Sequence, residues 1–364
     1  MNGIKNTLLL TLPSILVFIA FGEFFFRYVI PAASQPWGYY DANEKIARFA
    51  AEQGGGVYTI GRFAEQRGKW RINNAGWNSD IDYQSKDKRS RPLIAVIGDS
   101  YIEAFQVDVE KSIVSVVRNK LQGEYDVYGF GKSGAPLSQY LQMSRYVKKR
   151  FDPDIIVINI VHNDFDESLF SVNNLPYFLE IKINSQAEES TLSSTSISAK
   201  PTTKLIFESA MFRYLWHNLR YGESWTQFWS EHNGDTKAPA KNSGENLNRK
   251  AEIYRTVDYL VRKRKDENAG KEFVFLIDAP RRDINRGTVQ QSKELWMNKL
   301  LAELSTRYHC RFVDLTDPFR EQYAQDKVMF NSKYDYHWNE EGHKNAGEIL
   351  YRNPVNFGIV KASH

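Results

Sequence analysis

The chain has 364 residues, of which 42% are hydrophobic and 25% are charged, a balance that is ordinary for a globular protein. A net charge of +4 is small for this length and gives no case for a nucleic-acid partner, which would need basic residues clustered on one face. The single cysteine, Cys310, excludes an intramolecular disulfide and a cysteine-based zinc cluster. We expect Cys310 to be a buried thiol inside a strand.

The first element is an apolar segment over residues 6–26 that carries no charge before Glu23. It approaches the ~20 residues that cross a bilayer as a helix, and it is apolar all round, which disfavours a buried helix of the globular domain. We therefore predict a membrane anchor over residues 1–33. A cleaved signal peptide stays open, because Lys5 supplies a positive start and small residues lie near position 33. Charges on the two flanks nearly balance, and we place the domain outside the cytoplasm, in the periplasm or the extracellular space.

A polar extension follows over residues 34–91. The three glycines at 54–56 are expected to form a loop, and residues 69–77 are expected to form short strands with a turn. Residues 86–91 are read as a charged linker.

From residue 92 the chain alternates between apolar runs and helical patterns, which predicts an open parallel sheet covered by helices. The expected strands are 93–97, 125–128, 154–161, 273–278 and 311–315, and the expected helices are 111–121, 137–150, 246–265, 295–308 and 339–351. This domain spans residues 92–354, with an insertion at about 165–245. The insertion holds a polar tract, 184–201, which is expected to be flexible, and three tryptophans that suggest a lid: Trp216, Trp225 and Trp229.

Polar residues stand where the expected strands end, at the sheet edge on which α/β proteins bind ligands. These residues are Ser100, Gly134, Asn163, Asp335 and His337. A serine hydroxyl needs a base, a histidine supplies one, and a carboxylate holds the histidine in the correct tautomer. The backbone N–H groups of Ser100 and Gly134 and the amide of Asn163 would then stabilise an oxyanion.

The same residues resemble four sequence blocks of the SGNH (GDSL-like) hydrolase superfamily. Gly98-Asp99-Ser100 is similar to the block that holds the nucleophile, and Gly131-Lys132-Ser133-Gly134 is similar to the block whose glycine lines the oxyanion hole. His162-Asn163-Asp164 and Asp335-Tyr336-His337 are similar to the blocks that hold the oxyanion-hole asparagine and the Asp/His pair. The resemblance implies a flavodoxin-like three-layer sandwich with a central parallel sheet, and a catalytic triad of Ser100, Asp335 and His337.

One spacing departs from that pattern. The family usually places Asp three residues before His, whereas here Asp335 lies two before His337 and Tyr334 takes the usual position. The string Asp335-Tyr336-His337-Trp338 is also similar to the Asp-x-His-Trp motif of alginate O-acetyltransferase-like proteins. In those proteins the serine follows the motif, while Ser100 precedes it, so this second similarity is local.

Structural roles compete with these functional ones. Ser100 is also a good helix N-cap, Asn163 a loop residue and Gly134 a turn residue. We expect His162 and His343 to be structural and Asp99 to shape the turn before Ser100. Asp278 and Asp314 end strands, where they either support the site or cap a turn. No phosphate loop or metal-ligand cluster stands out, and we expect no cofactor and no metal.

These observations favour a serine-dependent esterase that removes acyl groups, such as O-acetyl, from an envelope or secreted glycan. An O-acyltransferase acting on a polysaccharide would use the same residues, because only the group that attacks the acyl-enzyme differs. A lipid acylhydrolase and a non-enzymatic glycan-binding protein are the remaining alternatives. The expected partners are an acylated glycan or other ester and, through the N-terminal helix, the membrane, without nucleic acid.

Overall fold

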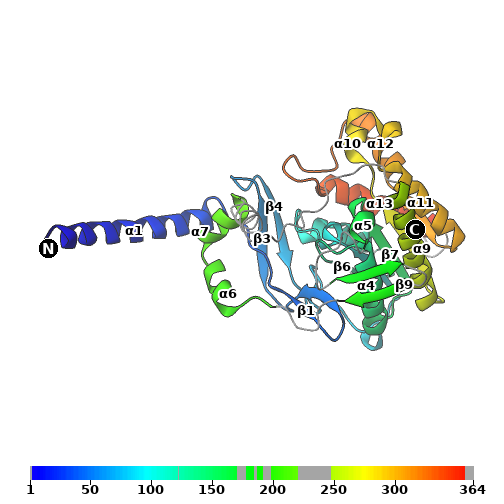
Figure 1. Ribbon diagram of the computed structural model, residues 1–364, viewed down its shortest axis with the longest axis horizontal. Coiled ribbons are helices and arrows are strands. Elements are labelled where there is room, and N and C mark those ends of the chain that lie inside the picture. The colour runs from blue at the N-terminus through cyan, green and yellow to red at the C-terminus, as the bar shows by residue number, and fades with distance from the viewer. Residues whose placement is uncertain are drawn as a thin grey trace.

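A computed structural model describes residues 2–121, 123–169, 178–183, 187–191, 198–219 and 247–356 (Figure 1). Its centre is a parallel sheet in the order β11-β10-β7-β5-β6. The strands are β5 (Leu93–Gly98), β6 (Asp126–Gly131), β7 (Ile155–Ile160), β10 (Glu272–Ile277) and β11 (Arg311–Asp314). All five expected strands are present and pair in parallel, which confirms the predicted fold.

Helices cover both faces of this sheet. α4 (Leu137–Phe151), α9 (Leu247–Glu267) and α11 (Leu295–Arg307) pack on one face, whereas α3 (Ile113–Lys120), α12 (Thr316–Asp326) and α13 (Glu340–Asn356) pack on the other. Alternate residues of β5 enter the two cores: Ala95 and Ile97 face the first, and Ile94 and Val96 face the second. Because β5 is buried on both faces, its sequence is a continuous apolar run, which is why it was predictable.

Short elements connect these layers. They are α2 (Ser100–Glu103), α5 (Asn163–Glu167), α10 (Arg281–Arg286) and three 3-10 turns, η1 (Lys86–Lys88), η2 (Val109–Lys111) and η4 (Val289–Gln291). The expectation for Cys310 is wrong. Cys310 lies just before β11, and its thiol is only half-buried.

The extension before the sheet forms two antiparallel hairpins, β1 (Gly38–Asp41) with β2 (Ile46–Phe49) and β3 (Gly55–Ile60) with β4 (Gln66–Arg71). The loop expected at the three glycines is therefore wrong, since Gly55 and Gly56 begin β3 and pair with Arg71 and Trp70. Strand pairing supplied by β4 outweighs the low strand propensity of glycine here.

The insertion holds ordered elements in its described part. A hairpin of β8 (Leu179–Ile183) and β9 (Ala187–Thr191) packs beside α4, so the expectation of flexibility is wrong for the portion of the polar tract that forms β9. Further on are α6 (Pro201–Phe207), α7 (Ala210–Arg213) and the π-helical turn η3 (Tyr214–Asn218). Trp216 belongs to η3, whereas Trp225 and Trp229 lie outside the described residues.

The N-terminal segment is one long helix, α1 (Asn2–Tyr28), which projects away from the domain (Figure 1). Its stretch Thr11–Tyr28 is long and apolar enough to cross a membrane or to serve as a signal sequence. The end of α1 is tied to the insertion: the Glu23 carboxylate accepts hydrogen bonds from the backbone N–H groups of Ala210 and Met211, and the Phe26 ring stacks on Tyr214 at 3.9 Å.

Candidate active site

Ser100 stands at the junction between β5 and α2, at the carboxyl edge of the sheet. Asp99 caps α2, because its carboxylate accepts a hydrogen bond of 2.9 Å from the backbone N–H of Tyr101. The expectation that Asp99 shapes this turn agrees with this bond. Burial raises the pKa of Asp99 to about 6. The other carboxylate oxygen of Asp99 lies 3.2 Å from Ser100 Oγ.

His337 lies beside Ser100, although it comes from the loop between α12 and α13. The distance from its Nε2 to Ser100 Oγ is 2.7 Å, and its Nδ1 lies 2.8 Å from both carboxylate oxygens of Asp335. Asp335 thus contacts His337 Nδ1 even though it lies two residues before His337 in the chain and not the usual three. Asp314 lies elsewhere: its carboxylate accepts hydrogen bonds from Asn298 and from the backbone N–H of Thr316.

The charge of Asp335 suits a residue that orients a histidine. Burial alone would raise the pKa of the Asp335 carboxyl, but the hydrogen bond and charge of His337, together with backbone hydrogen bonds from Tyr336 and His337, outweigh burial and hold this pKa below its ordinary value. Asp335 is therefore ionised at neutral pH, as the orienting carboxylate of such a triad has to be. His343 differs, because complete burial lowers its pKa to about 3 and keeps it neutral, with Nδ1 accepting from the Ile113 N–H.

A buried ion pair holds the backbone next to His337. Arg281 and Asp278 lie 3.0 Å apart, and both side chains are almost fully buried. Arg281 donates a hydrogen bond of 2.8 Å to the backbone carbonyl of Tyr336. Asp278 accepts one of 3.0 Å from the indole N–H of Trp338. The residues on either side of His337 are thus fixed by one pair at the end of β10.

Arg281 is missing from the sequence-based expectations, although Asp278 was singled out. A signal was available, since an arginine three residues after an aspartate at a strand end is within reach of it on the first helical turn. The sequence of α10 is rich in charged residues, which gives no hint that Arg281 alone among them is buried, and the partner carbonyl at Tyr336 lies 55 residues away.

The glycine-containing turn after β6 is held close to α2. A Cβ on Gly131 would lie 2.0 Å from the backbone N of Glu103, so only glycine allows this approach. The buried Glu103 carboxylate bonds Lys132 at 3.1 Å and also accepts a hydrogen bond from Ser133 Oγ. Gly134 follows with φ of +74°, a left-handed conformation that favours glycine. Glu103 anchors the turn that carries Gly134, and no sequence pattern indicated this role.

Asn163 begins α5, after Val161 and His162 at the end of β7, and its side chain is exposed at the same sheet edge. Its amide donates a hydrogen bond of 3.0 Å to the carboxylate of Glu167, one turn further along α5. β5 lies between β6 and β7 in the sheet, so Ser100 is flanked by the turn with Gly134 on one side and by Asn163 on the other. His162, expected to be structural, bonds Asn298 at 2.8 Å.

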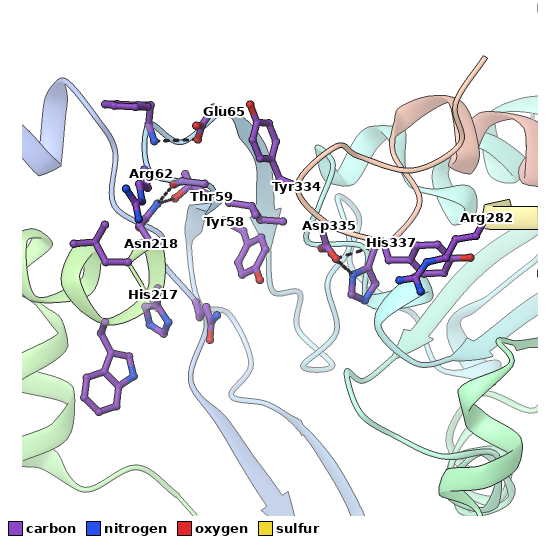
Figure 2. Close-up of a pocket in the computed structure, with 17 residues that line it drawn as sticks. Tyr58, Thr59, Arg62, Glu65, His217, Asn218, Arg282, Tyr334, Asp335 and His337 are labelled. Carbon is purple, nitrogen blue, oxygen red and sulfur yellow. Dashed lines mark hydrogen bonds and ion pairs between the residues drawn. The ribbon is translucent and has the colours of Figure 1, made fainter. Parts of the chain in front are cut away.

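A cleft of about 1240 Å³ runs along one side of His337 (Figure 2). One wall is the loop before α13 together with Arg282, and the other comes from the β3–β4 hairpin and η3. The labelled residues of the far wall include Tyr58, Arg62 and His217 (Figure 2). Within the described residues, no group of three or more His, Cys, Asp or Glu side chains is arranged to hold a metal ion.

The central parallel sheet, with Ser100, His337 and Asp335 gathered at its carboxyl edge, defines an α/β protein of the SGNH fold class. The model of the GDSL-like lipase/acylhydrolase family matches residues 96–344, and the chain belongs to this family, whose members are esterases and acylhydrolases. No curated protein sequence matches the chain.

Solved structures similar to the chain share little of its sequence. A lipolytic G-D-S-L family protein from Veillonella parvula is 9% identical, with 71% of this chain and 96% of that chain covered and a TM-score of 0.41. A carbohydrate esterase family 2 enzyme from Corynascus thermopiles (Myceliophthora fergusii) is 14% identical, with 79% and 72% covered and a TM-score of 0.39. Likenesses at this level carry no argument about substrate.

Proposed function

We propose that the chain is a serine-dependent esterase in which Ser100 is the nucleophile, His337 the general base and Asp335 the residue that orients His337. The observation that carries the proposal is the continuous contact from Asp335 through His337 to Ser100, at 2.8 and 2.7 Å. A hydrogen bond of this length lets the imidazole take the hydroxyl proton as the oxygen attacks an acyl carbon.

The proposed reaction has two steps. Ser100 Oγ attacks the acyl carbonyl while His337 Nε2 takes its proton, and the tetrahedral oxyanion is stabilised by the N–H groups of Ser100 and Gly134 and by the amide of Asn163. His337 returns the proton to the departing alkoxide, which leaves an acyl-enzyme. Water then attacks the acyl-enzyme while His337 takes its proton. His337 returns this proton to Ser100 Oγ as the acid leaves.

The proposed substrate is an acylated glycan of the cell envelope or a secreted polysaccharide, with O-acetyl as the group removed. The cleft beside His337 supports this choice, because it is open and carries aromatic side chains on both walls, including Tyr58, Trp216 and Tyr334. Aromatic rings with a polar tip suit the stacking and hydrogen bonding that sugars require. The likeness of residues 335–338 to alginate O-acetyltransferase-like proteins stays a prediction.

The proposed organisation is a membrane anchor over residues 1–33, an extension over 34–91 and a hydrolase domain over 92–354 with its insertion. The exposed apolar surface of α1 between Thr11 and Tyr28 supports the anchor. The catalytic domain is proposed to lie outside the cytoplasm, where envelope and secreted glycans are found.

Labelling of the full-length protein with a fluorophosphonate probe tests this function. The parent should be labelled, Ser100→Ala should not, and the matched variant Ser90→Ala, in the segment before β5, should be labelled like the parent. Release of acetate from an acetylated glycan, with and without an unacetylated acceptor glycan, then separates hydrolysis from transfer. Full labelling of Ser100→Ala would refute the assignment of the nucleophile.

A further inference from the structure

Exposed apolar side chains outside α1 gather near its end. Beyond α1 and the turn that follows it, six large hydrophobic side chains are exposed among the described residues. Two of them, Met329 and Tyr334, belong to the loop before α13. The other four form what we call the apolar collar: Phe63, Leu205, Ile206 and Leu215. A surface of this kind is costly in water unless something covers it.

The collar is built on segments that pack on one another and on α1. α7 packs against α1, and α6 packs against α7. The turn that carries Phe63 is bonded to η3, because Tyr214 Oη donates to the Arg62 carbonyl at 2.7 Å and the Asn218 amide donates to the Gly61 carbonyl at 3.1 Å. The collar therefore lies on segments that adjoin the place where α1 enters the domain.

α6 has the sidedness of a helix that lies in a membrane surface. Thr203 and Phe207, four residues apart, are half-buried against the domain, and the Phe207 ring contacts Trp37. Leu205 and Ile206 lie on a different sector and are 75% and 49% exposed. Between these sectors lies exposed Lys204. An apolar sector bordered by a basic residue is the arrangement that interfacial helices use.

Figure 1 shows α6 running crosswise to α1, on the face of the domain from which α1 projects. A helix crosswise to a membrane-spanning helix, at the level where that helix leaves the bilayer, lies parallel to the membrane plane. Two exposed basic residues, Lys204 on α6 and Arg62 beside Phe63, adjoin these apolar side chains, and anionic lipid headgroups attract such residues.

We propose that the apolar collar is a second, peripheral membrane contact, with α6 and the turn between β3 and β4 resting in the headgroup layer of the bilayer that α1 spans. The proposal rests on the membrane anchor put forward above. A single membrane-spanning helix leaves the domain free to change its orientation relative to the membrane plane, whereas the collar would fix the tilt of the domain. Because η3 and the β3–β4 hairpin also form one wall of the cleft, the membrane contact would hold the cleft at the bilayer surface.

Depth measurements on the full-length chain in vesicles of phosphatidylethanolamine and phosphatidylglycerol test the proposal. The cysteine substitutions Leu205→Cys, Lys204→Cys, Leu16→Cys and Glu321→Cys, each combined with Cys310→Ser, carry the environment-sensitive fluorophore NBD. Position 16 reports on α1. Position 321 is an exposed site on α12, away from the collar, and serves as the negative control. Position 204 is the neighbour of Leu205 on the charged sector of α6. Lipids that carry a nitroxide near the headgroup report contact with the bilayer surface, and lipids that carry it deep in the acyl chain report insertion of position 16.

The proposal predicts blue-shifted, quenched emission at position 205, weaker quenching at 204 and none at 321. Quenching at 16 together with emission at 205 as in water would overturn the collar while leaving the anchor intact. No quenching at 16 would overturn the anchor and the collar together. Fluorophosphonate labelling of Ser100 in the same vesicles reports separately on the proposed esterase, so the failure of one proposal is distinguishable from the failure of the other.

Discussion

The imidazole of His337 lies 2.7 Å from the hydroxyl of Ser100, although 237 positions separate the two residues in the chain. The contact is made by a loop that is held on both sides of His337, at the Tyr336 backbone carbonyl by Arg281 and at the Trp338 indole by Asp278. The geometry of the proposed triad therefore depends on Arg281 and Asp278, which stand outside the contact of Asp335, His337 and Ser100.

Asp335→Asn is expected to lower kcat by roughly 10⁴, because an amide cannot hold the imidazole in the tautomer that accepts the serine proton or stabilise the imidazolium. Steady-state hydrolysis of an acetyl ester measures this loss. The matched control is Asp314→Asn, whose carboxylate bonds Asn298 and Thr316 and does not contact His337. If Asp314→Asn lost activity and Asp335→Asn did not, the assignment of the carboxylate would be wrong while the Ser100–His337 pair would stand.

Asn163→Ala is expected to slow turnover on the order of 10²–10³, the usual cost of losing one oxyanion donor. Fluorophosphonate labelling of Ser100 should persist at a reduced rate, since the nucleophile and its base are unchanged. Asn345→Ala, which removes an asparagine on α13 whose amide donates to the Glu341 carbonyl of the same helix, is the control and should behave like the parent. Turnover of Asn163→Ala at the parental rate would reduce the oxyanion hole to the backbone N–H groups of Ser100 and Gly134.

Most of the sheet was predictable, because strands such as β5 and β7 are buried on both faces and their sequences are unbroken apolar runs. The residues at their carboxyl ends were predictable for the same reason, because the ends of the predicted parallel strands define the carboxyl edge of the sheet. The far wall of the cleft was not. It is assembled by contacts such as that between Tyr214 and Arg62, which are 152 residues apart. A single sequence carries no local signal for such contacts, and β3 begins with glycines that suggest a loop.

Asp99→Asn is expected to stabilise the protein at alkaline pH and to have little effect at acidic pH. Burial raises the pKa of Asp99 to about 6 from its ordinary value of 3.8. Because the pKa is higher in the folded state, the stabilising contribution of the proton is fully present below 3.8 and is lost as the pH rises through 6. Asparagine keeps an oxygen that can accept from the Tyr101 N–H and has no charge to bury.

Urea unfolding of the parent and of Asp99→Asn at about pH 4 and about pH 8 measures this effect, and the difference between the two proteins should grow by roughly 2–3 kcal/mol toward the higher pH. Asp317→Asn is the control, because Asp317 is exposed on α12 and its substitution should leave the pH dependence of the parent unchanged. A constant difference between parent and Asp99→Asn across this range would show that Asp99 does not carry the proton.

Arg281→Met is expected to lower the free energy of unfolding by about 3–5 kcal/mol, because it leaves the carboxylate of Asp278 buried without its partner. Both side chains are nearly inaccessible to water, so solvent cannot replace the lost charge. Combining Arg281→Met with Asp278→Asn removes the unpaired charge and keeps an oxygen able to accept from the Trp338 indole. The double variant should therefore be more stable than Arg281→Met alone. Urea unfolding of the parent, both single variants and the double variant completes the cycle. Additive effects would mean that the two residues act independently and do not jointly hold the loop beside His337.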